Sequence, residues 1–312
     1  MNAVMWRLHR HQAAFGAAAL IGATVVLLVT GLVMAGDYHR AAVGCASTAS
    51  CSSLAGQLFQ GDGLIIDLVD ASIAVPILLG MFWGVPLLAK EVESGTHVLA
   101  WTQSMTRRRW IATKAGWALA GAAASGAAVS ALVTWWRSPE DALQGGRFGV
   151  FDITGVVPVA YGLFAVALGM AAGAVLRRVL PAMAVTLVGF AALRLAVGLW
   201  LRPHLLAPVR HAFALVNDSS GAPPGSWVLS RVVVSPGGKV LSSVAGIPGA
   251  CHTAYFRGRT TSCLASLGYR RLVTYQPAGR FWALQGIEAG LFLALGVVLV
   301  GVAFWFLLRR DA

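Results

Sequence analysis

Charged residues are scarce in this sequence, and their scarcity narrows the class of protein. Only 12% of the 312 residues are Asp, Glu, Lys or Arg, whereas 57% are hydrophobic and the mean hydropathy is +0.72. Soluble domains usually carry about 25% charged residues. A chain this poor in charge is predicted to be built for a lipid bilayer.

Several catalytic and nucleotide-binding signatures are also missing. The fragment nearest to the phosphate-binding loop G-x-x-x-x-G-K-[ST] is Gly237-Gly238-Lys239-Val240, which lacks the first glycine and the final hydroxyl. The chain contains neither the Gly-x-Ser-x-Gly turn of serine hydrolases nor the His-Glu-x-x-His helix of zinc proteases. ATP binding through such a loop is therefore excluded, and these two hydrolase classes lack their signatures here.

Long apolar runs occupy most of the chain and predict transmembrane helices. A helix needs about 20 apolar residues to cross a ~30 Å hydrocarbon core, and unpaired backbone groups are too costly in lipid for irregular structure. The second run begins at Ala71 or as early as Leu64, and the division between the fourth and fifth rests on Arg177, Arg178 and Pro181. The six predicted spans are Phe15–Ala35, Ala71–Ala89, Ala115–Trp136, Ile153–Leu176, Val179–Leu201 and Leu284–Leu308.

The distribution of basic residues predicts the orientation of these spans. With the N-terminus inside, the cytoplasmic segments hold eleven basic residues, whereas the two short outer loops hold only Arg40, Arg137 and Arg147. Short loops rich in basic residues face the cytoplasm, while long loops cross regardless of charge. Both termini are therefore predicted to be cytoplasmic, and the net charge of +12 is explained without a nucleic-acid partner. The expected topology anchors are Arg107, Arg108, Arg109, Arg177 and Arg178.

The four cysteines fall in the predicted outer segments, where disulfides persist. Four cysteines allow three connectivities, and the local pairs Cys45–Cys51 and Cys251–Cys263 are expected. A metal site built on Cys251, His252 and Cys263 would lack a fourth ligand and regular spacing, so no metal is expected. The first span exceeds the core of about 7–15 residues found in cleaved signal peptides, so it is taken as an uncleaved helix.

A small extracellular domain is expected between the fifth and sixth helices. The β-forming runs Trp227–Val234 and Lys239–Val244 flank the turn sequence Ser235-Pro236-Gly237-Gly238, a pattern typical of a β-hairpin. The predicted fold is an all-α polytopic membrane protein with six transmembrane helices and this added domain. The expected divisions are a membrane bundle over 1–201, an extracellular domain over 202–283, and the sixth helix with a short tail over 284–312.

One polar elbow, residues 90–110, interrupts the apolar sequence. Lys90 to Glu93 continue the second helix beyond the membrane, Gly95 can end it, and Thr96 can begin a short helix that contains Leu99 and Trp101. Thr106 can cap the third span. A solvated loop with cytoplasmic arginines would explain Arg107–Arg109, but it would not explain Glu91 and Glu93 beside Gly-Thr.

The run Lys90-Glu91-Val92-Glu93-Ser94-Gly95-Thr96, followed by Leu99 and Lys114, resembles the elbow of permease subunits of type-two ATP-binding-cassette (ABC) exporters. That family usually shows Arg-Glu-x-Glu-x-Gly-Thr, a leucine a few residues later and a lysine entering the next span. Lys90 departs from the usual arginine, and Ser104 stands where many relatives have proline. The outer domain is also longer than in many relatives.

The resemblance implies which residues meet a partner. It assigns Glu91, Glu93, Gly95, Thr96 and Leu99 to the region that docks on a separate cytoplasmic ATPase subunit, and Trp101 lies in the same predicted short helix as Leu99. It implies a working unit with two ATPase subunits and a second permease subunit, in a homodimer or heterodimer within membrane lipid. No cofactor is expected in this chain, because ATP and Mg²⁺ would bind to the ATPase.

Ionisable residues also occur within or beside the spans. Arg194 lies in the middle of the fifth span, and Glu288 lies near the outer end of the sixth, one helical turn after Gln285. Charges at membrane depth are costly and usually face protein or water. Arg194 and Glu288 are therefore candidates for a polar path or for helix pairing, and for the acidic residues a structural role is preferred.

These features predict a permease that exports a lipophilic or amphipathic compound, such as a drug, antibiotic or lipid. Two other classes stay open: a polytopic membrane enzyme with a site near His252 or His211, and a membrane scaffold or sensor that binds a ligand through its outer domain. The Arg-heavy basic set, 21 Arg against 3 Lys, is typical of GC-rich bacterial genomes. The expected location is therefore a bacterial plasma membrane.

Overall fold

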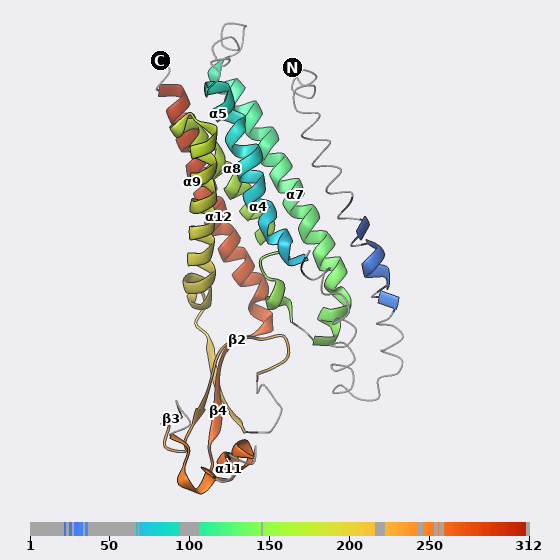
Figure 1. The fold of residues 1–312 in the computed structure, drawn as a ribbon, viewed down its shortest axis with the longest axis vertical. Helices are drawn as coiled ribbons and strands as arrows, with labels where there is room; N and C mark the ends of the chain where they lie inside the picture. Colours follow the sequence, from blue (N-terminus) through green and yellow to red (C-terminus); the bar gives the residue numbers. More distant parts are fainter. Residues whose placement is uncertain are drawn as a thin grey trace. The chain divides into compact units, whose positions relative to one another are not determined.

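A computed structural model describes residues 22, 25–26, 28–33, 35–36, 67, 69–93, 106–144, 146–215, 222–241, 246–252, 255 and 259–309 (Figure 1). The chain divides into two compact units. The first unit takes its residues from Met1–Leu143, Asp152–Gly189 and Ala289–Ala312, and the second consists of Gln144–Phe151 and Phe190–Glu288.

The first unit is helical. The second predicted span is a continuous run of short elements: η1 (Ser72–Ala74), α4 (Val75–Leu79), the π-helical η2 (Gly80–Gly84) and α5 (Val85–Glu93). It is followed by α7 (Arg107–Gln144) and α8 (Val157–Leu176). Helix α9 (Val179–Ala196) begins in this unit, and α12 (Phe281–Arg309) ends in it.

Among the residues that the structure describes, five helical runs are long and apolar enough to cross a membrane, in agreement with the second to sixth predicted spans. The fourth span was predicted to begin at Ile153, but α8 begins at Val157, where Pro158 fits the first turn because its missing N–H has no helical acceptor there. Of the first predicted span, the described residues are helical, and its crossing and the cytoplasmic termini stay predictions. The five runs are Val69–Lys90, Arg108–Ser138, Val157–Leu176, Val179–His204 and Ala278–Arg309.

Glycines allow α8 to pack closely against the run from α4 to α5. A Cβ atom on Gly169 would collide with the carbonyl oxygen of Gly80, and a Cβ atom on Gly173 would lie 3.0 Å from the carbonyl oxygen of Val85. Gly84 faces the backbone of Val166 in the same way: a Cβ atom added to Gly84 would lie 2.7 Å from the carbonyl oxygen of Val166. Small residues permit such backbone contact between helices in lipid. Gly169 and Gly173 therefore form one G-x-x-x-G motif, which packs inside the unit against a second one formed by Gly80 and Gly84.

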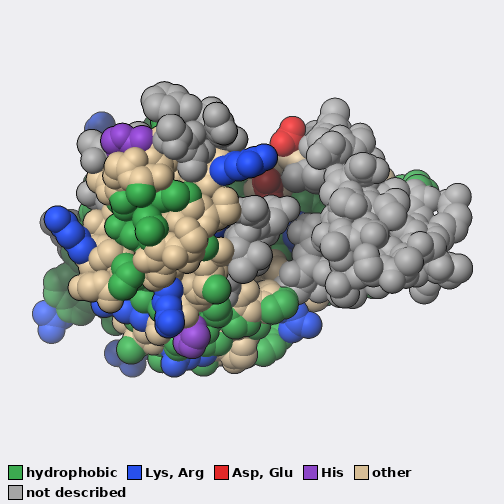
Figure 2. Space-filling view, turned by 90° about the horizontal axis from the view of Figure 1, so that it is seen from below, with side chains coloured by type: hydrophobic (Ala, Val, Ile, Leu, Met, Phe, Trp, Pro, Cys, Tyr) green, Lys and Arg blue, Asp and Glu red, His purple; other side chains and the backbone are tan. Residues whose placement is uncertain are grey.

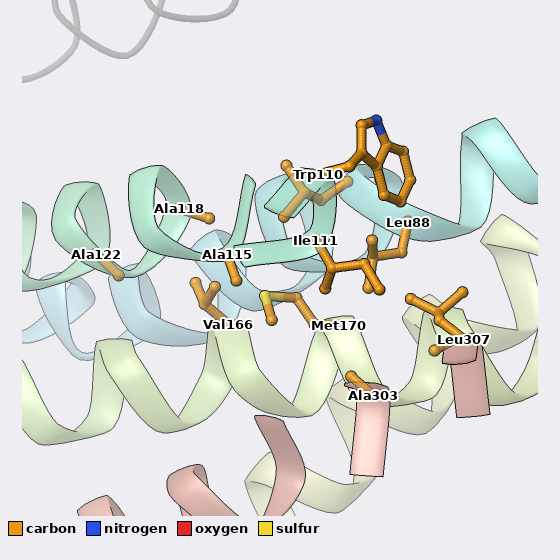
Figure 3. Packing of buried hydrophobic residues seen from close by; sticks show 12 residues of the cluster. Leu88, Trp110, Ile111, Ala115, Ala118, Ala122, Val166, Met170, Ala303 and Leu307 are labelled. Carbon is orange, nitrogen blue, oxygen red and sulfur yellow. The ribbon is translucent and has the colours of Figure 1, made fainter. Parts of the chain in front are cut away.

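A buried apolar cluster joins four helices of this unit (Figure 3). It brings together side chains from α5, α7, α8 and α12. The largest members are fully or almost fully buried, including Leu88, Ile111, Met170 and Leu307. The cluster consists of Leu87, Leu88, Trp110, Ile111, Ala115, Ala118, Ala122, Val166, Met170, Ala174, Ala303 and Leu307.

The second unit contains a four-stranded antiparallel sheet with strand order β1-β4-β2-β3 (Figure 1). Its strands are β1 (Val209–Ala214), β2 (Trp227–Val234), β3 (Val240–Leu241) and β4 (Arg270–Gln276). The unit also contains η3 (Arg147–Val150), η4 (Val197–Leu201), η5 (Arg202–His204), η7 (Gly249–Cys251), α11 (Thr260–Ser266) and η8 (Ala278–Arg280).

The sheet shows that the all-α description was too narrow for residues 202–283. The predicted β2–β3 pairing around Ser235–Gly238 is present, with Val234 opposite Val240, and Lys239 N–H donates to the hydroxyl of Ser235. The second strand was predicted to reach Val244, but β3 ends at Leu241 and residues 242–245 lie outside the described part. Strands β1 and β4 were not predicted. They pair across about sixty residues of sequence, so no local turn marks them.

Candidate functional site

The elbow predicted to meet a partner is held between α5 and α7. Its residues 94–105, which include Gly95, Thr96, Leu99 and Trp101, lie outside the described part of the chain, as do the side chains of Glu91 and Arg107. The structure therefore describes the two helical arms on which the elbow is mounted. Their contacts determine what a movement of the elbow would displace.

The end of the first arm is hydrogen-bonded to a third helix. The carboxylate Oε2 of Glu93 accepts a hydrogen bond from the backbone N–H of Val179 at 3.2 Å. Val179 is the first residue of α9, where backbone N–H groups have no partner within the helix and the helix dipole favours an anion. Glu93 thus caps α9 from outside, although the sequence assigned it to partner docking.

The connection that precedes α9 is very short. Arg177 ends α8 in a left-handed conformation with φ of 55°, and its N–H donates to the carbonyl of Gly173 at 3.0 Å. Arg178 follows as an exposed side chain, and the N–H of Ala182 donates to its carbonyl at 3.2 Å. The predicted anchors Arg177 and Arg178 therefore form the turn between α8 and α9, beside the end of α5.

The second arm begins at a capped terminus. The N–H of Arg109 donates to the hydroxyl oxygen of Thr106 at 3.4 Å, and the N–H of Trp110 donates to the Thr106 carbonyl at 3.1 Å. The predicted capping role of Thr106 is confirmed. Arg108 and Arg109 are exposed, which is compatible with their expected role as topology anchors.

One turn later, the second arm enters the core. The ammonium group of Lys114 lies 4.4 Å from the ring centroid of Trp110, close enough for a cation–π interaction. Both side chains are buried, at 4% and 6% exposure. Trp110 and Ile111 belong to the same cluster as Leu87 and Leu88 of the first arm (Figure 3).

The two arms therefore share one packed core. Close-packed interiors transmit displacement because a void or an overlap is costly. A force applied to residues 94–105 would act on α5 and α7 together, and through the cluster on α8 and α12. The hydrogen bond from Val179 to Glu93 adds α9 to this set.

The second unit contains a buried ion pair. Arg202 Nε and Nη2 donate to the two carboxylate oxygens of Glu288, at 2.7 and 2.8 Å. The Glu288 side chain is fully buried and that of Arg202 is 9% exposed. The guanidinium carbon lies 4.2 Å from the ring centroid of Phe151, and Gln285 Nε2 donates to the Phe151 carbonyl at 2.7 Å.

The sequence identified only part of this cluster. Glu288 and Gln285 were singled out, and for the acid a structural role was preferred, as a partner of Arg194 or as an interfacial residue, whereas the structure pairs it with Arg202. Arg202 was missed because the apolar run was ended at Leu201, whereas the helical run continues through η5 to His204. Arg194, the other predicted candidate, is half-buried on α9, and its role in a polar path or in helix pairing stays a prediction.

Two more side chains tie the base of the sheet to η5. Gln276, the last residue of β4, donates from Nε2 to the carbonyl of Leu206 at 2.6 Å. Arg280 Nη1 donates to the carbonyl of Ala207 at 2.6 Å and to Gln276 Oε1 at 3.0 Å. Together with the Arg202–Glu288 pair, these bonds hold the incoming and outgoing chains of the sheet beside each other.

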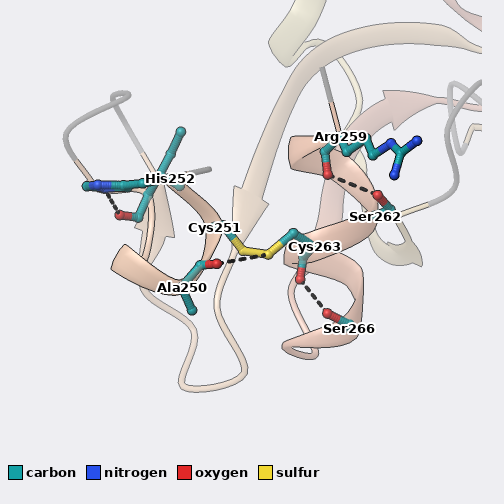
Figure 4. Close-up of a disulfide and its surroundings, with 8 residues drawn as sticks. Ala250, Cys251, His252, Arg259, Ser262, Cys263 and Ser266 are labelled. Atoms are coloured by element: carbon teal, nitrogen blue, oxygen red, sulfur yellow. Dashed lines mark hydrogen bonds between the residues drawn. A yellow bond between two sulfur atoms is a disulfide. The ribbon is translucent and has the colours of Figure 1, made fainter. Parts of the chain in front are cut away.

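The disulfide between Cys251 and Cys263 is present, as predicted, and joins η7 to α11 (Figure 4). The Cα atoms are 5.7 Å apart, and a small apolar cluster with Leu215, Ile247 and Leu264 surrounds Cys251. A ring nitrogen of His252 lies 3.1 Å from the Ile247 carbonyl. The predicted pair Cys45–Cys51 lies outside the described part of the chain.

Comparison with known proteins gives one family match. The model of a family described as "ABC-2 membrane transporter related" matches residues 17–202, which is more than half of the chain. No curated protein and no solved structure matches the chain significantly. The matched region contains both arms of the elbow and ends at Arg202, where the sheet-bearing segment begins.

Proposed function

Because the chain belongs to the ABC-2 membrane transporter related family, we propose that it exports a lipophilic or amphipathic compound and is driven by a separate ATPase subunit that docks on residues 90–110. Membership makes the chain an ABC-2 type permease, a membrane transport subunit rather than an enzyme, and implies partnership with an ABC ATPase. The substrate class, the direction of transport and the docking site are the parts proposed here.

The shared core of the two arms carries the proposal. ATP binding would bring two ATPase subunits together and displace the elbow of each permease subunit. Because Leu88 of α5 and Ile111 of α7 are buried in one cluster with Met170 of α8, that displacement would move several membrane helices at once. Binding energy would thus favour one of two arrangements of the bundle.

The assembly proposed for this mechanism contains two permease subunits and two ATPase subunits in a bacterial plasma membrane. The second permease subunit is a copy of this chain or a related chain. ATP and Mg²⁺ would bind to the ATPase subunits, since the sequence has no phosphate-binding loop.

The first unit contains an apolar pocket with room for about one water molecule, which is too small for a lipophilic or amphipathic compound. Its walls are mainly apolar and come from the α4 run, α7 and the start of α8. Two polar side chains, Ser72 and Asp152, lie among them. The Tyr161 hydroxyl donates to Asp152 at 3.1 Å, which fixes the carboxylate. A site for a drug-sized compound needs about 300–1,000 Å³, so the proposed substrate class rests on the family resemblance.

Substitution of the elbow tests docking directly. Leu99→Arg places a charge in the predicted apolar contact, so we expect the chain to lose co-purification with its ATPase while still inserting in the membrane. The matched control is Leu267→Arg, which changes an exposed leucine of the second unit. Equal retention of the ATPase by both variants would show that the elbow does not dock it.

A further inference from the structure

The second membrane span, Val69–Lys90, changes its helical geometry along its length. The 3-10 turn η1 leads into α4, and the π-helical η2 separates α4 from α5. At the end of η2 the N–H of Val85 donates to the carbonyl of Gly80, five residues earlier, whereas an α-helix bonds residues four apart. Short 3-10 and π segments inside a helix often mark hinges or functional sites. This span is therefore not a uniform rod at η2.

The local sequence favours a bend at this point. Pro86 has no N–H, so it cannot donate to the carbonyl of Phe82, its partner in an α-helix, or to that of Met81, its partner in a π-helix. Gly80 and Gly84, at the two ends of η2, weaken a helix further. Prolines, glycines and π turns are the usual causes of sharp bends in helices, and all three occur here.

The two helices on either side of η2 are held to different degrees. In α5, Val85, Leu88 and Ala89 are almost completely buried, and they belong to two apolar clusters shared with α7, α8, α9 and α12. Before η2, Ile73 and Leu78 are 41% and 48% exposed. Helix α5 is therefore fixed in the core of the first unit, whereas α4 is covered on fewer sides.

Helix α8 supports η2 through a contact made of backbone. A Cβ atom on Gly169 would collide with the carbonyl oxygen of Gly80, so no side chain separates the two helices there. The Trp83 ring covers Gly121 of α7, which holds η2 from a second helix. Ridges of side chains that pack into grooves are what normally fix the crossing angle of two helices. A contact between glycines has no such ridge, so it can act as a pivot.

We propose that η2 is a hinge at which α5, displaced by the elbow, tilts relative to α4; the source of this displacement rests on the proposed function, whereas the hinge is a property of this chain. The segment before η2 forms one wall of the small apolar pocket of the first unit, and a tilt would move that wall relative to α7 and α8. Such a movement would widen a pocket that otherwise has room for about one water molecule. The lining residues of this wall are Ser72, Ile73, Val75, Pro76 and Leu79.

Ionisable side chains are distributed unequally about the hinge. Residues 72–84, from η1 to η2, contain none, whereas the sequence of α5 contains Lys90, Glu91 and Glu93. Figure 2 shows Lys and Arg side chains at several separate places on the face in view, and not in one cluster. A charged partner would therefore act on α5, while packing and backbone hydrogen bonds determine the position of α4.

Spin labels can measure the hinge in the full chain in nanodiscs of phosphatidylcholine. One label is attached at Val297→Cys, on an exposed residue of α12, and the other at Ile73→Cys before η2 or at Lys90→Cys on α5. Dilution with unlabelled chain restricts the measurement to distances within one chain. A bend of about 20° acting over the roughly 10 Å of helix from Ile73 to Gly80 displaces the first label by about 4 Å. Without any ATPase, the distance distribution from Ile73 should therefore be broader than that from Lys90.

Two variants remove the causes of the bend. Deletion of Phe82, which is 60% exposed, takes the extra residue out of the π turn, so that α4 and α5 continue as one α-helix. Pro86→Ala restores an N–H donor and serves where the deletion prevents folding. In both variants the Ile73 distribution should narrow to the width of the Lys90 distribution. The matched control is Pro181→Ala, in the first turn of α9, where an N–H has no helical partner; it should keep the broad distribution.

Three results would overturn the hinge: equal widths for the two label positions in the wild type, a broad Ile73 distribution that persists in the variants, or the same narrowing in Pro181→Ala. A second measurement adds the ATPase with ATP and vanadate, which should shift the mean distance from Ile73 in the wild type but not in Pro86→Ala. A broad distribution that does not shift would uphold the hinge and contradict the proposed ATP-driven coupling. The two failures are therefore distinguishable.

Discussion

Arg202 and Glu288 form a bidentate ion pair that joins the end of the α9 helical run to the first turns of α12. The pair is almost completely removed from solvent, and the Phe151 ring stacks on the guanidinium group. Burying two charges is costly, and the cost is recovered only when the geometry is good and the remaining polar atoms are bonded. The two-point contact meets the first of these conditions.

Removing one partner of this pair should destabilise the protein strongly. Arg202→Met or Glu288→Leu leaves a buried charge without its partner, which costs about 3–5 kcal/mol in comparable cases. The double variant Arg202→Met/Glu288→Leu leaves no buried charge, so it should lose less stability than either single variant. Thermal unfolding of the purified protein in one detergent would measure all three variants.

A control for that series is Arg210→Met, which removes an exposed arginine of the same unit. It should leave the unfolding temperature nearly unchanged, because exposed charges contribute little to stability. If the decrease in stability of the double variant equals the sum of the decreases in the two single variants, the two side chains are not energetically coupled.

The glycines between α8 and the α4–α5 run give a second prediction. Gly169→Val should prevent stable folding or lower the unfolding temperature markedly, because the added atoms would collide with the backbone of Gly80. Gly301→Val is the matched control, since a Cβ atom on Gly301 of α12 meets no atom within 4 Å. Expression and elution by size-exclusion chromatography would report the difference. Expression and elution of Gly169→Val like those of the wild type would show that α8 and the α4–α5 run are less closely packed than the structure indicates.

Membrane spans could be predicted from the sequence because the signal is local. An apolar run of about 20 residues is sufficient evidence for a spanning helix, and five such runs were placed correctly to within a few residues at most of their ends. The pairing of β1 with β4 could not be predicted, because each strand is short and its partner is about sixty residues away. The β2–β3 pairing was visible, since Ser235-Pro236-Gly237-Gly238 marks the turn between them.

The candidate sites divide in the same way. Thr106 was assigned as a cap from its position before a helix, and its hydroxyl accepts the expected N–H. The hydrogen bond between Glu93 and Val179 joins residues 86 positions apart, so it could not be predicted from the spacing of residues in the sequence. Arg202 was missed because an arginine that follows an apolar run resembles an ordinary interfacial residue, and only the folded chain brings Glu288 to it.

The disulfide should stabilise the distal part of the second unit. The cysteines are 12 positions apart, and closing a loop of that size stabilises a fold by about 3 kcal/mol in the chain-entropy description. Cys251→Ser/Cys263→Ser should therefore increase cleavage by added protease within residues 246–267, while cleavage elsewhere stays unchanged. Mapping the cut sites by mass spectrometry would test this. Unaltered cleavage would show that the surrounding apolar cluster is sufficient to hold η7 and α11.

The contact between Glu93 and Val179 separates two roles for this glutamate. If Glu93 caps α9, Glu93→Gln keeps an oxygen that can accept the Val179 N–H, whereas Glu93→Ala removes it at a cost of about 1 kcal/mol. We therefore expect the glutamine variant to resemble the wild type. The alanine variant should still co-purify with the ATPase but should show less transport-coupled ATP hydrolysis, because α9 is no longer fastened to the end of α5. Loss of the ATPase from the glutamine and alanine variants alike would instead mean that the negative charge itself docks the partner.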